Sequence, residues 1–138
     1  MKTTITSVFK GGMSFSTEIR GHNVVIDLDK NNGGQNLGTS PKVLMLVSLA
    51  GCTGVDVVGI LNKKRVAFSD LSIEVNAALT EEHPTIYNDV SLTYKIKVNA
   101  KDQAKVKQAV HLSQDKYCGV SKMFRAFATL HYTIEFLD

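Results

Sequence analysis

Short stretches of alternating apolar and polar residues lie on either side of one long apolar stretch. Near the N-terminus, "TTITSVF" and "MSFSTEI" alternate in this way and flank Lys10-Gly11-Gly12, which predicts a β-hairpin. "NVVIDL" predicts a third strand. The next segment, "DKNNGGQNLGTSPK", is rich in Asn and Gly, so we expect a loop and the most flexible part of the chain.

The long apolar stretch reads as a single helix. Ser40 and Pro41 predict its start, because Ser is favoured at the N-cap and Pro at the first helical position. Cations in "NKKRVAF" suit its C-terminal end. From Val43 to Leu61 nearly every face is apolar, and such a helix is usually covered by protein on all sides. A small chain struggles to cover so long a helix alone, so we expect a second subunit, that is, a homodimer.

The rest of the chain returns to shorter elements. "DLSIEVNAALT" and "VSLTYKIKVNA" alternate like half-buried strands and predict an antiparallel pair. "DQAKVKQAVHLSQDKY" and "SKMFRAFATL" have helical spacing, with Met123, Phe124 and Phe127 expected in the core, and "LHYTIEFLD" ends the chain as a strand. The order predicts a single α+β domain, residues 1–138, with an antiparallel sheet and helices on one side of it.

Composition narrows the classes of protein that fit. The net charge of +3 comes from scattered Lys and Arg residues, and no nucleic-acid-binding motif occurs, so we expect no nucleic-acid partner. The N-terminus has no apolar region typical of a signal peptide. No uninterrupted apolar run approaches the ~18 residues of a membrane span, so we expect no membrane association and a cytoplasmic location. There, two cysteines are more often reduced, catalytic or redox-active than permanently bridged.

The two cysteines are the candidates for chemistry. Cys52 lies in the apolar "VSLAGCTGVDVVGIL" and Cys118 far along in "DKYCGVSKMF", so no local metal-binding or CxxC spacing exists. The four histidines are scattered and no nucleotide-binding glycine motif occurs, so we expect no metal and no cofactor. A thiolate attacks a peroxide to give a sulfenic acid, and a second thiol condenses with it to a disulfide. This reaction requires that the two cysteines meet in space.

The surroundings of each cysteine leave alternatives open. Cys52 is either a small packing residue or a nucleophile, and the small residues Ala50, Gly51 and Gly54 beside it serve close packing or access. Gly119 predicts a break between two helical pieces, and Cys118 at the start of the second piece would have its pKa lowered by the helix N-terminus.

A carboxylate complicates the activation of Cys52. Asp56 lies one turn after Cys52 and would raise the pKa of its thiol unless a cation intervenes. The sequence does not choose among the candidate cations, which are Arg20, Arg125, Lys42 and Lys122.

Two segments together resemble a known family. "SPKVLMLVSLAGCTGVDVVGIL" on the long helix and "LSQDKYCGVSKMFRA" before the last strand resemble the OsmC/Ohr family of osmotically induced and organic hydroperoxide resistance proteins, most closely its YhfA-like branch. The resemblance covers nearly the whole chain. It implies antiparallel sheets packed on a long central helix, and an intertwined homodimer with a swapped N-terminal sheet and active sites at the subunit interface.

The resemblance also implies roles for the cysteines. Cys52 matches the peroxide-attacking cysteine and Cys118 the resolving cysteine of a thiol-dependent peroxidase, a redox enzyme of the stress response. Its substrates are organic hydroperoxides and its reductants small or lipoyl-type dithiols. The family's peroxidases carry an acidic residue shortly after the Pro that starts the helix, and an Arg in the first turn between strands. Here Lys42 and Val43 follow Pro41, and the turn offers only Lys10.

Two functions from different classes therefore remain. The first is the organic hydroperoxide reductase, with Cys52 and Cys118 as the catalytic pair and Arg20, Arg125 and Asp56 as candidates for activation or substrate contact. The second is a protein that binds an apolar small molecule or senses redox state, with little or no peroxidase activity. The reactivity of the thiols near neutral pH separates the two, because only the enzyme needs a fast-reacting thiolate.

Overall fold

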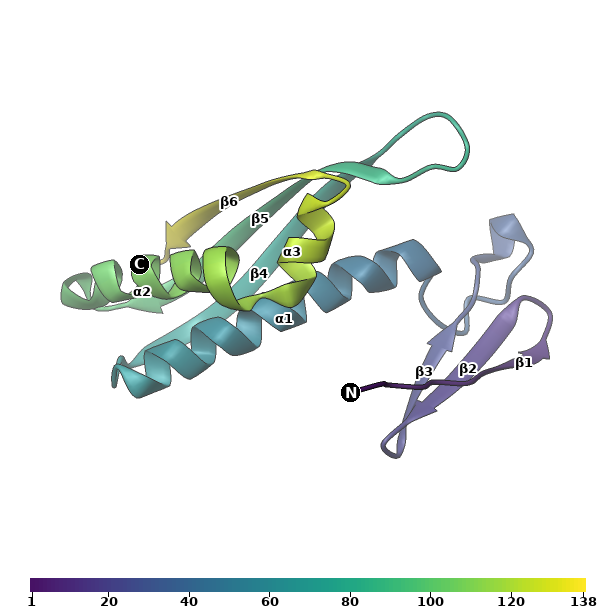
Figure 1. Ribbon diagram of the computed structural model, residues 1–138, viewed down its shortest axis with the longest axis horizontal. Helices are drawn as coiled ribbons and strands as arrows, with labels where there is room; N and C mark the ends of the chain where they lie inside the picture. Colours follow the sequence, from purple (N-terminus) through teal and green to yellow (C-terminus); the bar gives the residue numbers. More distant parts are fainter. The chain divides into compact units, whose positions relative to one another are not determined.

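The computed structural model describes all 138 residues and divides the chain into two compact units, Met1–Val47 and Ser48–Asp138 (Figure 1). Each unit holds one three-stranded sheet, with order β1-β2-β3 in the first and β4-β5-β6 in the second. The order along the chain is three strands, a long helix, two strands, helices and a final strand, as the apolar pattern predicted. The α+β class is thereby confirmed.

The N-terminal unit is a fully antiparallel meander. Its strands are β1 (Ser7–Gly11), β2 (Ser14–Ile19) and β3 (His22–Ile26). Gly11 and Gly12 have positive φ angles of 99° and 57° at the predicted hairpin turn, a conformation that glycine adopts without steric cost. Phe9 pairs with Phe15 across the hairpin, with ring centroids 5.5 Å apart.

The loop after β3, which we expected to be the most flexible segment, is organised around one buried carboxylate. Asp27 is 1% exposed and accepts backbone N–H bonds from Leu28, Gln35 and Leu37, at 2.8, 3.2 and 3.1 Å. Burial alone would raise the pKa of Asp27, but the three backbone donors outweigh it and hold the pKa below its usual value. A short 3-10 turn, η1 (Lys30–Asn32), lies within this loop.

The long helix α1 (Pro41–Lys63) begins at the predicted proline. Its buried residues follow one another every four positions and form a single stripe, made of Leu49, Thr53, Val57 and Leu61. One chain therefore covers one face of a helix whose sequence is apolar on nearly every face. By length and composition alone α1 is long and apolar enough to cross a membrane, a test that core helices of soluble proteins also pass.

The C-terminal unit corrects one part of the predicted topology. Strands β4 (Phe68–Leu79) and β5 (Tyr87–Val98) are antiparallel as expected, but β6 (Thr129–Phe136) pairs with β5 in parallel. The physical reason is the connection, since helices α2 (Gln103–Leu112) and α3 (Gly119–Arg125) carry the chain back to the end where β5 began. The expected antiparallel sheet is therefore mixed in this unit.

The core of the C-terminal unit lies between its sheet and its helices, which lie over one face of the sheet in Figure 1. Every second residue of β5 is buried on that face, namely Val90, Leu92, Tyr94 and Ile96. Phe124 of α3 joins this core at 1% exposure. Met123 and Phe127, also expected in the core, are 64% and 38% exposed, because α3 turns Ser121 and Phe124 inward and Phe127 lies beyond its end.

Candidate functional site

The two cysteines occupy different kinds of backbone within the C-terminal unit. Cys52 lies in the middle of α1 and is half-buried. Cys118 is 4% exposed and joins the π-helical turn η3 (Ser113–Tyr117) to α3. Its backbone is extended, with φ −76° and ψ 100°, so the helix break predicted beside Gly119 is present. Both thiols are free.

The fold brings these two thiols together. Cys52 lies near enough to Cys118 to be among the groups that raise the pKa of Cys118. Formation of a disulfide from a sulfenic acid requires two cysteines that lie close in space. Within one chain, Cys52 and Cys118 are such neighbours. The separation needed for a disulfide stays a prediction, as do the attacking and resolving roles.

The pKa of Cys118 moves opposite to our expectation. Burial raises it and is the largest effect. The hydroxyl and the backbone N–H of Ser121 lower it, and the neighbouring Cys52 raises it again. The N–H of Ser121 donates to Cys118 Sγ at 3.3 Å, so the predicted helix-start interaction exists. It is outweighed because the sulfur is almost completely removed from water.

A buried polar network lies beside the thiols and ties their segments together. Thr53, the residue after Cys52, places Oγ1 2.7 Å from Tyr94 Oη and 2.7 Å from Ser113 Oγ. Gln114 Nε2 donates to Tyr94 Oη at 2.7 Å. Burial raises the pKa of Tyr94, so the phenol stays protonated and available as a donor. Helix α1, strand β5 and turn η3 are thus joined through three hydroxyls and one amide.

Asp56 and Arg125 are both engaged by this network. Ser113 Oγ donates to Asp56 Oδ2 at 2.9 Å, which gives that carboxylate a partner other than a cation. Arg125 donates from Nη1 to the Gln114 carbonyl at 2.7 Å and from Nη2 to Gln114 Oε1 at 2.9 Å. Gln114 precedes Cys118 and Arg125 follows it. These two bonds therefore connect the segments on either side of the helix break at Cys118.

The other candidate cations lie elsewhere in the fold. Arg20 occupies the turn between β2 and β3, in the N-terminal unit, with a left-handed φ of 51°. Lys42 is in the first turn of α1, and Lys122 is exposed on α3. Their roles in activating Cys52 stay predictions.

Sequence reasoning missed the network because each member looks ordinary on its own. Tyr94 fits the apolar alternation of β5, and Ser113 and Gln114 look like the polar end of a helix. The available signal was Thr53, a polar residue on the stripe that also holds Leu49, Val57 and Leu61. A buried hydroxyl at such a position needs a partner, but the sequence does not say which.

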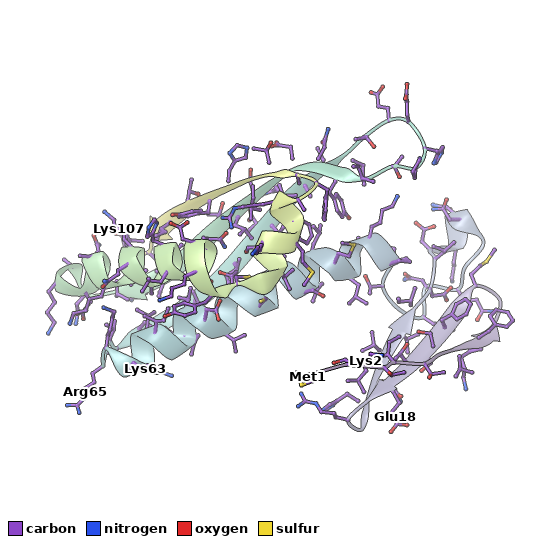
Figure 2. The ribbon with its side chains drawn as sticks, viewed as in Figure 1. Met1, Lys2, Glu18, Lys63, Arg65 and Lys107 are labelled. Atoms are coloured by element: carbon purple, nitrogen blue, oxygen red, sulfur yellow. The ribbon has the colours of Figure 1, made fainter.

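A groove runs along α1 from one turn beyond Cys52. Its volume is about 440 Å³, and it is lined by Val55, Asp56, Gly59, Ile60, Lys63, Lys64, Leu112 and Tyr117. The α1 residues of the groove continue the helical stripe that starts at Cys52, with spacings of three and four. The lining includes the apolar Val55, Ile60 and Leu112, and also Lys64 and Lys63, which Figure 2 labels at the end of α1. No three His, Cys, Asp or Glu side chains are grouped to hold a metal.

Known proteins share both the sequence pattern and the fold. Residues 33–132 match the family model described as OsmC-like protein. Protein YhfA of Escherichia coli K12 is 30% identical over 125 residues, which is 90% of each chain. The crystal structure of a hypothetical protein from Aquifex aeolicus is similar over the full length of both chains, with 27% identity and a TM-score of 0.80.

A second structure has a function in its name. An organic hydroperoxide resistance protein from Elizabethkingia anophelis, crystallised with thiocyanate, shares the fold over 99% of each chain, with a TM-score of 0.69 and 14% identity. At that identity the likeness concerns the fold alone. The match over residues 33–132 includes both cysteines, all of α1 and the π-helical turn. The chain therefore belongs to the OsmC-like family.

Proposed function

We propose that the chain is a thiol-dependent peroxidase that reduces organic hydroperoxides with Cys52 and Cys118. The observation that carries the proposal is the proximity of these two free thiols, which come from distant parts of the sequence and lie near enough for Cys52 to raise the pKa of Cys118. Membership of the OsmC-like family supports it, because that family includes hydroperoxide resistance proteins. We place the reaction in the cytoplasm, where thiols are kept reduced.

The chemistry balances in three steps. The Cys52 thiolate attacks the O–O bond of ROOH, which gives Cys52 sulfenic acid and, with one proton, the alcohol ROH. Cys118 then attacks the sulfenic sulfur, so that a disulfide forms and water leaves. A small or lipoyl-type dithiol reduces the disulfide by exchange, becomes a cyclic disulfide itself and returns both cysteines to thiols.

The assignment of roles follows from burial. Cys52 is the more accessible cysteine and lies one helical turn before the groove, so a peroxide with an apolar group reaches it first. Cys118 has a raised pKa, which keeps it protonated at neutral pH until a sulfenic acid forms beside it. This difference suits an attacking Cys52 and a resolving Cys118.

Activation of Cys52 is where this chain departs from the family pattern. Lys42 follows Pro41 where the family's peroxidases have an acidic residue. We therefore propose that Arg20 or another cation activates Cys52 in place of the family's acid and Arg pair. The reaction of Cys52 with peroxide should then be slower than in the family's peroxidases. We also propose a homodimer with an exchanged N-terminal sheet, since Val55 of α1 is 70% exposed in a single chain.

Substitution of each cysteine tests the proposal. Wild type should consume cumene hydroperoxide continuously when a dithiol is present, and Cys52→Ser should consume none. Cys118→Ser should consume one equivalent and then hold Cys52 as a sulfenic acid that dimedone traps. If wild type consumes no more peroxide than a protein-free control, the peroxidase proposal is wrong.

The groove favours a second candidate, the binding of an apolar small molecule. A cavity of about 440 Å³ lies within the range of ligand sites, and Ile60 and Leu112 form part of its apolar lining. In that case thiol alkylation should be fast only in unfolded protein, and an alkyl probe such as decanoate should bind wild type and Cys52→Ser equally. Weaker binding by Ile60→Gln would then locate the ligand in the groove.

A further inference from the structure

Ser121 has a hydroxyl without a partner in a place where such groups are rare. The residue lies in the first turn of α3 and is 0% exposed. Its Oγ is the one buried side-chain nitrogen or oxygen in the chain that has no hydrogen bond. Leaving a buried hydroxyl unpaired costs free energy, so most proteins pair or replace it. We therefore look for a function that would explain why an unpaired hydroxyl is buried at this position.

The nearest chemistry is the sulfur of Cys118. The backbone N–H of Ser121 donates to Cys118 Sγ at 3.3 Å. The hydroxyl belongs to the same residue as this N–H donor, so it lies in the neighbourhood of the sulfur, and Ser121 lowers the pKa of Cys118. No atom pairs with the hydroxyl in hydrogen-bonding geometry. A neutral thiol is a weak acceptor, whereas a thiolate is a strong one. The hydroxyl thus has a use only when the sulfur is charged.

We propose that Ser121 is a further catalytic residue, whose hydroxyl donates a hydrogen bond to Cys118 Sγ whenever that sulfur carries negative charge. This inference rests on the proposed peroxidase cycle for its biological meaning, but its physical content concerns one thiol and one hydroxyl. Burial protects Cys118 from solvent and oxidants, and the same burial opposes its ionisation. Ser121 offsets that opposition inside the protein.

Charge develops on Cys118 at two steps. In the first, Cys118 loses its proton and attacks the sulfenic sulfur of Cys52; the S–S bond forms, the S–O bond breaks, and hydroxide leaves and is protonated to water. In the second, a thiolate of the external dithiol attacks the Cys52 sulfur of the disulfide, and Cys118 leaves as a thiolate. A donor fixed beside Cys118 Sγ lowers the barrier of both steps.

A direct test follows the ionisation of Cys118 without any peroxide. In the Cys52→Ser background the chain has one cysteine, so the ¹³Cβ shift of labelled cysteine reports Cys118 alone. Adding Ser121→Ala should raise the midpoint of this titration by about one pH unit. Ser121→Thr keeps the hydroxyl and should stay near the parent. Ser14→Ala removes a buried serine hydroxyl in the N-terminal unit and is the matched control.

Thermal unfolding separates a catalytic from a structural hydroxyl. Ser121→Ala should unfold at the same or a higher temperature, because it removes an unpaired buried group and Ala favours helix. A Ser121→Ala protein that fails to fold, or that loses stability while the Cys118 titration is unmoved, would overturn the proposal. An unmoved midpoint in a stable protein would overturn it as well.

The catalytic consequence is measured with both cysteines present. Ser121→Ala should consume the first equivalent of cumene hydroperoxide at the wild-type rate, and then form the disulfide about tenfold more slowly at pH 7. If wild type consumes no peroxide, the peroxidase function fails, while the titration still decides whether Ser121 stabilises the Cys118 thiolate. Equal rates of disulfide formation in an active protein would overturn the catalytic role.

Discussion

The two three-stranded sheets of this molecule alternate alike in sequence but differ in burial. In the C-terminal sheet, Leu92 and Ile96 are completely buried under the helices of their unit. In the N-terminal sheet, Phe9 and Phe15 are 58% and 43% exposed. The buried strand residues of that sheet are polar, namely Ser14 and Thr17.

The difference shows what alternation does and does not establish. Alternation identifies the two faces of a strand, but a face becomes buried only when another layer packs on it. The C-terminal sheet has α2, α3 and most of α1 in its own unit, whereas the N-terminal sheet has no layer of helices in its unit. We therefore expect a second copy of the chain to bury more of the N-terminal sheet than of the C-terminal sheet.

The largest expected effect comes from truncating one side chain in each sheet. Leu92→Ala should lower the free energy of unfolding by about 2–5 kcal/mol, because it opens a cavity in a closed core. Phe15→Ala should cost about 1 kcal/mol or less in dilute protein, where its ring is partly solvated. Urea unfolding over a range of protein concentrations measures both.

The dependence on protein concentration distinguishes Phe15→Ala from Leu92→Ala. In the proposed homodimer the cost of Phe15→Ala should grow as the protein becomes more concentrated, while that of Leu92→Ala should stay constant. A Phe15→Ala cost that does not depend on concentration would mean that no second copy covers the N-terminal sheet.

Three glycines of α1 give a smaller and more local comparison. A Cβ at Gly51 or Gly59 would meet nothing within 4 Å, whereas one at Gly54 would lie 3.2 Å from Ile73 Cδ1. Gly51→Ala and Gly59→Ala should each stabilise an isolated chain by about 1 kcal/mol through helix propensity. Gly54→Ala should gain less, because Ile73 must shift.

Dimerisation should reverse the sign at Gly51. If α1 packs closely on a second copy there, Gly51→Ala should weaken the dimer while it stabilises the monomer. Analytical ultracentrifugation gives the dissociation constant of each variant, with Gly54→Ala as the control that faces the sheet. An unchanged constant for both Gly51→Ala and Gly59→Ala would place the interface elsewhere on the chain.

The strands and helices were predictable because their signals are local. Ser40-Pro41 marks the start of α1, and the Gly11-Gly12 pair marks the first hairpin, so each depends only on neighbouring residues. The parallel pairing of β6 with β5 was not predictable, since pairing direction depends on the path of some thirty intervening residues and not on the alternation within either strand.

The site was predictable in its sulfurs and not in their surroundings. Cys52 and Cys118 stood out as the only cysteines, and the fold makes them neighbours. The sign of the Cys118 pKa shift was wrong, because the sequence reveals a helix start but not how deeply that start is buried. The unpaired hydroxyl of Ser121 likewise emerges only when every neighbouring atom has a position.

The smallest expected effects are those of pH, and they have opposite signs in the two units. Backbone donors hold the pKa of Asp27 below its usual value of 3.8, although burial alone would raise it. The stabilisation from ionised Asp27 is therefore present above pH 3.8 and is lost as the pH falls through the lowered folded value. Asp27→Asn should flatten the acid side of the stability curve and leave the alkaline side unchanged.

The ionisation of Cys118 should lower the stability of the fold at alkaline pH. Burial raises its pKa above the usual value of 9.0, so above pH 9.0 the unfolded chain releases this proton more readily than the folded chain. Stability should be full below that pH and fall as the pH rises beyond it. Urea unfolding between pH 7 and 10.5 should show a steeper loss for wild type than for Cys118→Ser, with Asp27→Asn matching the wild-type slope. Equal slopes for wild type and Cys118→Ser would show that the folded protein ionises this thiol as easily as the unfolded chain does, and the resolving role assigned to a protonated Cys118 would lose its physical basis.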